Sequence, residues 1–66
     1  MNDEVTIIYD DMEYTGEYIV DENMIAVFFE DTEKRTQIDS FLHQELSLAK
    51  ILLRKLVIEN LKSGRV

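Results

Sequence analysis

The chain has 66 residues, 45% of them apolar, with no cysteine and no proline, so we expect one small folded domain over residues 1–66 rather than a disulfide-stabilised secreted module or a disordered acidic tail. Its net charge of −7 is unevenly placed, because residues 1–33 hold eleven acids and no base, whereas residues 34–66 hold seven bases and three acids. The chain starts without a basic and apolar leader, and its longest apolar runs are too short to cross a membrane, so we expect a cytoplasmic protein.

The first half of the chain predicts three β-strands. Apolar and polar residues alternate with a period of two over about 4–10 and 13–20, and a continuous apolar run covers about 24–30. Asp10-Asp11 and Asp21-Glu22-Asn23 separate these segments and are typical of tight turns. Turns this short make sequential strands antiparallel neighbours, which predicts a β-meander.

Four further details of the strand region concern single residues or segments. Gly16 falls on the apolar side of its strand, where we expect a large neighbour to press against the backbone. We expect Asn23 to take the positive φ angle of the second turn. The inward face of the third strand stays open, and residues 34–38 fit either a short fourth strand or an extended approach to the next element.

The second half of the chain predicts one long helix over about 40–62. The apolar period changes from two to 3.6 after residue 38, with Asp39 or Ser40 as N-cap and Gly64 suited to the left-handed position after the helix. The expected fold is therefore α+β, with the meander packed against this helix. The expected core stripe consists of Leu42, Leu46, Ala49, Leu53, Leu56 and Val57.

The helix carries more apolar surface than one sheet face should cover. Some 22 to 24 helical residues span roughly 33 to 36 Å, whereas a six-residue strand spans about 20 Å. We therefore expect a homodimer formed helix against helix about a two-fold axis. The alternative is that Leu48 and Ile51 are isolated surface residues. The expected interface consists of Phe41, Leu48, Ile51, Leu52, Lys55 and Ile58.

The chain contains no recognisable catalytic, metal or cofactor motif. His43 is the only histidine and lacks a Cys or second His to complete a zinc site. Ser40 lacks the surroundings of an activated nucleophile. The acidic clusters do not have the ligand and glycine spacing of a calcium-binding EF-hand loop. We therefore expect a protein that is not an enzyme and that needs no cofactor.

The acidic residues are the main functional lead. Carboxylates two residues apart on a strand stand about 6 to 7 Å apart on one face, comparable to successive nucleic-acid phosphates. We expect an acidic protein–protein interaction module that binds a basic partner, including an inhibitor of the anti-CRISPR or anti-restriction type that acts by charge mimicry. The alternative is a small structural or regulatory protein whose acids only give solubility. The expected surface consists of Asp10, Asp11, Glu13, Glu17, Asp21, Glu22, Glu30 and Asp31.

Direct nucleic-acid binding is not expected. Tyr9, Tyr14 and Tyr18 could stack on bases, but stacking platforms lie in positively charged grooves, and the first three strands contain no base. We interpret the tyrosines as core and cross-strand residues. Contact with a membrane is not expected either.

Three segments carry a resemblance to a group of small uncharacterised bacterial proteins. Tyr14-Thr15-Gly16-Glu17-Tyr18, Thr36-Gln37-Ile38 and the Leu/Arg-rich run 48–56 together resemble a pattern in which a β-meander ends in a Thr-Gln segment before one helix. The chain departs from it at Asp39-Ser40, where glycines are expected, and in its acidity. The resemblance implies the fold and carries no activity or site residue.

Overall fold

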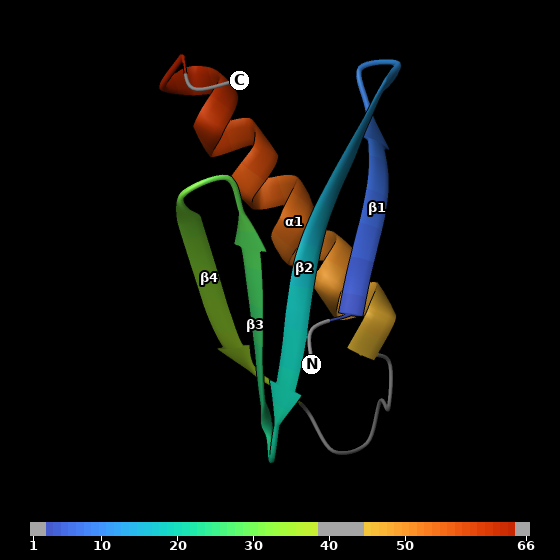
Figure 1. Cartoon of the computed structure of the whole chain (residues 1–66), viewed down its shortest axis with the longest axis vertical. Helices are drawn as coiled ribbons and strands as arrows, with labels where there is room; N and C mark the ends of the chain where they lie inside the picture. The colour runs from blue at the N-terminus through green and yellow to red at the C-terminus, as the bar shows by residue number, and fades with distance from the viewer. Residues whose placement is uncertain (1–2, 39–44, 65–66) are drawn as a thin grey trace.

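The computed structural model describes residues 3–38 and 45–64, and there it shows a four-stranded antiparallel sheet with a helix across one face (Figure 1). The strands follow in the order β1-β2-β3-β4. The α+β class and the meander are therefore confirmed. The fourth strand, which the sequence pattern left undecided, is present. The elements are β1 (Asp3–Tyr9), β2 (Met12–Asp21), β3 (Met24–Phe29), β4 (Thr32–Gln37) and α1 (Glu45–Lys62).

Tight turns with positive φ angles join the strands. Asp10 and Asp11 have φ angles of 54° and 63°, which suits a two-residue hairpin because this turn twists in the same sense as the strands it joins. In the second turn Glu22 has the positive φ of 54°, so the expectation for Asn23 was wrong. Glu30 has a φ of 55° in the third turn. Two glutamates thus hold a conformation that favours glycine or asparagine.

The odd-numbered residues of β3 face the helix. Ile25, Val27 and Phe29 are buried in the core with Val5 of β1, which settles the face that the apolar run left open. Ala26 lies on the opposite side and is still only 6% exposed. The pairing of residues across the three hairpins places side chains of the same face opposite one another in all four strands.

At Gly16 the side chain of Leu53 from the helix lies against the backbone of β2. A Cβ atom at Gly16 would lie 2.7 Å from the backbone oxygen of Phe28 and 2.8 Å from Cδ1 of Leu53. A side chain of any size would collide with both neighbours. The expected pressure against this backbone is confirmed, and Leu53 of α1 and β3 supply it together.

The helix packs diagonally across the sheet and contacts all four strands (Figure 1). The buried residues of α1 are Ala49, Leu52, Leu53, Leu56, Val57 and Asn60. Leu46 was expected in this stripe but is 49% exposed. Gly64 has the left-handed φ of 73° that the sequence predicted for the helix end.

The length argument for an overhanging helix does not hold for the described part of α1. Its 18 residues span about 27 Å, whereas the 10 residues of β2 span about 33 Å. The expected helix start, with Ser40, Phe41, Leu42 and His43, lies outside the described residues.

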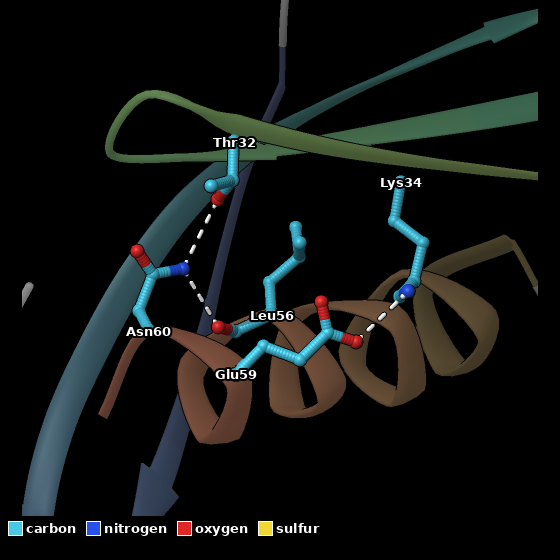
Figure 2. Close-up of polar contacts among 5 residues, drawn as sticks. All are labelled: Thr32, Lys34, Leu56, Glu59 and Asn60. Carbon is cyan, nitrogen blue, oxygen red and sulfur yellow. Dashed lines mark hydrogen bonds and ion pairs between the residues drawn. The ribbon is translucent and has the colours of Figure 1, made fainter. Parts of the chain in front are cut away.

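Polar contacts tie the C-terminal half of α1 to β4 (Figure 2). The side-chain amide of Asn60 donates to the carbonyl of Leu56 at 2.7 Å and to the hydroxyl of Thr32 at 3.1 Å. Lys34 forms an ion pair with Glu59 at 3.0 Å. These contacts fix one side of the helix, while Arg54 lies 5.8 Å above the ring of Tyr9 on the other.

We predict that Gly16→Ala destabilises the protein by about 1–3 kcal/mol, because Leu53 and the strand backbone must move to admit the new methyl group. Urea unfolding followed by circular dichroism measures this loss. Thr15→Ser, at the neighbouring exposed position, is the control, because it keeps the hydroxyl that lies 2.9 Å from that of Thr6. An equal loss in the control would contradict the close-approach explanation.

We also predict that Glu22→Gly stabilises the protein by about 0.5–1 kcal/mol, because glycine adopts the positive φ without steric cost. Glu22→Gln is the matched control, since it removes the same charge and keeps the side chain. Thermal unfolding should show a higher midpoint for the glycine variant only. A gain in both variants would mean that charge, and not backbone conformation, limits this turn.

Candidate functional site

The sheet face opposite α1 carries most of the acids that lie on strands. Side chains alternate between the two faces along each strand. The residue pairing therefore places on this side the even-numbered residues of β1 and β3 and the odd-numbered residues of β2 and β4. One base, Arg35, shares the face and contacts the carboxylate of Glu33. We call this surface the outer acidic face, and its acids are Glu4, Glu13, Glu17, Asp21 and Glu33.

Three of these acids form a row across the strands. Glu4 lies directly opposite Glu17, Glu17 opposite Phe28, and Phe28 opposite Glu33. Like charges directly opposite each other on adjacent strands are destabilising. The Glu4–Glu17 pair has no ion-pair partner among the described residues. The half-buried ring of Phe28 lies beside it.

Along β2 the acids of this face are spaced more widely than expected. Glu13, Glu17 and Asp21 recur at every fourth residue, so neighbours are about 13 Å apart. Thr15 and Ile19 fill the intervening positions, and the hydroxyls of Thr15 and Thr6 lie within hydrogen-bond distance at 2.9 Å. This spacing is about twice the 6 to 7 Å between carboxylates two residues apart, which was the spacing expected to match successive phosphates.

The eight acids expected from sequence do not form one surface. Only Glu13, Glu17 and Asp21 belong to the outer acidic face. Glu22 lies in the turn at one end of the sheet, and Asp10, Asp11, Glu30 and Asp31 lie in the two turns at the other end (Figure 1).

The sequence analysis missed Glu4 and Glu33. Glu4 could have been found, since it has the same parity as Thr6 and Ile8 on the side of β1 opposite Val5. Placing Glu33 required the fourth strand and its register.

A shallow hollow of about 150 Å³ opens on the outer acidic face. Ala26 is among its lining residues and is nearly covered, while Met24 is exposed. Apolar side chains therefore lie between one acid, Asp21, and one base, Arg35. The lining residues are Ile19, Asp21, Met24, Ala26 and Arg35.

A second hollow, of about 200 Å³, lies where α1 meets β4 and is lined by Thr32, Glu59, Asn60 and Ser63. Asn60 is 1% exposed, and its Oδ1 atom has no hydrogen-bond partner among the described residues. The one carboxylate here, Glu59, is paired with Lys34. The described residues include no group of three or more His, Cys, Asp or Glu arranged to hold a metal ion.

The residues expected at a dimer interface have different environments. Leu52 is 5% exposed and belongs to the core of the single chain, which removes it from the expected interface. Leu48 is half-buried and packs against that core. Ile51 is 52% exposed, and Lys55 and Ile58 lie on the same side of α1. Phe41 lies outside the described residues.

Comparisons of the chain with protein-family models, with curated proteins and with solved structures gave no match. In the part of the chain that the structure describes, no helix has the length and apolar character needed to cross a membrane.

We predict that Glu17→Gln stabilises the protein by about 0.2–1 kcal/mol, because it removes the repulsion between Glu17 and Glu4. Glu13→Gln is the matched control: it changes the same residue type on the same strand and face, but Glu13 lies opposite Ile8. Urea unfolding at low salt measures both variants. Equal gains would show that overall charge, and not this pair, is responsible.

Proposed function

We propose that this protein is a non-enzymatic interaction module whose outer acidic face binds a basic partner protein. The observation that carries the proposal is the Glu4–Glu17 pair, two carboxylates in direct register that form no ion pair with a base of the described residues. Repulsion of this kind lowers the stability of a small domain. A basic side chain from another molecule would relieve it on binding.

The surroundings of the pair suit a lysine- or arginine-rich surface. Phe28, beside Glu17, offers an aromatic ring to a guanidinium group. The hollow around Ile19 and Ala26 supplies apolar contact area inside a charged rim, which is the common anatomy of protein interfaces. Electrostatic complementarity of this kind speeds association and selects the partner.

A narrower form of the proposal is an inhibitor of a nucleic-acid enzyme of the anti-CRISPR or anti-restriction type. Such an inhibitor would occupy a basic groove built for phosphates. The spacing of about 13 Å between acids along β2 favours general charge complementarity over a phosphate-by-phosphate match. The alternative function, a structural or regulatory protein kept soluble by its acids, predicts no preference for one face.

The proposal predicts face-specific binding of a basic probe. We expect Glu17→Lys to weaken binding of a fluorescein-labelled deca-arginine peptide by about tenfold or more at roughly 0.15 M salt, because it places a like charge at the contact. Glu45→Lys makes the same change of charge on α1 and is the matched control. Fluorescence anisotropy measures both affinities.

The control variant distinguishes a binding surface on the outer acidic face from a general effect of net charge. If Glu45→Lys weakens binding as much as Glu17→Lys, the peptide responds only to overall charge, and the outer acidic face is not a binding surface. A preserved affinity in the control, with the loss confined to Glu17→Lys, supports the proposal.

A further inference from the structure

The solvent-facing side of α1 has the opposite character to the outer acidic face. Its residues recur at intervals of three or four along the helix, so they lie on one stripe. The stripe holds two isoleucines and two lysines and no acid. We call it the outer helix stripe, and it consists of Ser47, Ile51, Lys55, Ile58 and Lys62.

The charges of this stripe oppose the two-fold helix-to-helix dimer that the sequence suggested. An antiparallel contact that sets Ile51 against Ile58 of a second copy would place Lys55 beside Arg54 of that copy. Both sides of such a contact are basic at its centre. Juxtaposed like charges disfavour an interface strongly.

We propose instead that the outer helix stripe binds the outer acidic face of a second copy of this chain. Ile51, which is 52% exposed, enters the hollow of about 150 Å³ that Ala26 helps to line. Lys55 and Lys62 then approach the acids of β2. The contact is head to tail, because it joins two different surfaces, and it leaves one of each surface free at the ends.

This self-contact rests on the proposed function, since it uses the same acidic face, and it adds a regulatory consequence. A helix of 18 residues has a footprint of about 300 Å² when its width is about 11 Å. The two copies therefore bury about 600 Å² in total, below the roughly 1,000 Å² of a stable interface. Self-association is accordingly weak, and a basic partner displaces it.

Paramagnetic relaxation between copies tests where the contact lies. The chain has no cysteine, so Lys50→Cys, at an exposed position beside the outer helix stripe and not within it, supplies a single thiol for a nitroxide label. The nitroxide-labelled protein is mixed at millimolar concentration with ¹⁵N-labelled protein that carries no nitroxide. The nitroxide should then broaden the amide signals around Ala26 and Phe28 of the ¹⁵N-labelled copy. Added deca-arginine peptide should reverse the broadening. Broadening confined to α1, or none at all, would overturn the proposal.

Charge-reversal substitutions test whether the outer helix stripe of one copy binds the outer acidic face of another. Lys55→Glu and Glu17→Lys should each weaken self-association by about tenfold, as measured by sedimentation equilibrium. An equimolar mixture of the two variants should associate again, because each supplies one native surface. A helix-to-helix dimer predicts the reverse pattern: Lys55→Glu would strengthen association and Glu17→Lys would leave it unchanged.

The two proposals can fail separately. If the wild-type protein binds deca-arginine through the outer acidic face but shows no broadening between copies, the self-contact is wrong and the proposed function stands. If broadening appears at Ala26 while the peptide binds without preference for a face, the self-contact stands alone. Spectra of the unmixed variants that match the wild type away from the substitution verify the fold.

Discussion

The close approach of Leu53 of α1 to Gly16 of β2 is the contact on which the placement of the helix on the even-numbered side of β2 depends. Because Gly16 has no side chain, Leu53 can lie against the strand backbone, and the even-numbered side of β2 becomes the covered side. Side chains alternate strictly along a strand, so a shift of one residue would exchange the two faces completely. The acids at positions 13, 17 and 21 therefore remain in solvent for the same reason that the core forms on the other side.

The features that depend on local sequence were predictable. Period-two and period-3.6 patterns identified the strands and the helix, and the acidic pairs identified the turns. The face of β3 was not predictable, because all six of its residues are apolar and only packing against α1 distinguishes them. Leu46 fits the helical period but is exposed, since the diagonal crossing of α1 decides which part of its apolar stripe the sheet covers.

The candidate surface was predictable only in part, because it depends on register. Counting acids identified Glu17 but also selected turn residues that lie at opposite ends of the sheet. Glu4 becomes significant only when the pairing of β1 with β2 places it opposite Glu17. Register is a tertiary property set by the turns and the buried face together, and the one-dimensional pattern does not report it.

The charges of the two faces do not pair with each other in the described part of the molecule. The ion pairs among the described residues use Lys34 and Arg35 of β4, and neither uses a lysine of the outer helix stripe. Those lysines are separated from the outer acidic face by at least the helix diameter of about 10 Å. That distance exceeds the Debye length of about 8 Å at physiological salt, so attraction through the molecule is largely screened. Apart from the contact between Arg35 and Glu33, no ion pair among the described residues joins either face to an opposite charge, and both proposals rest on this separation of charge.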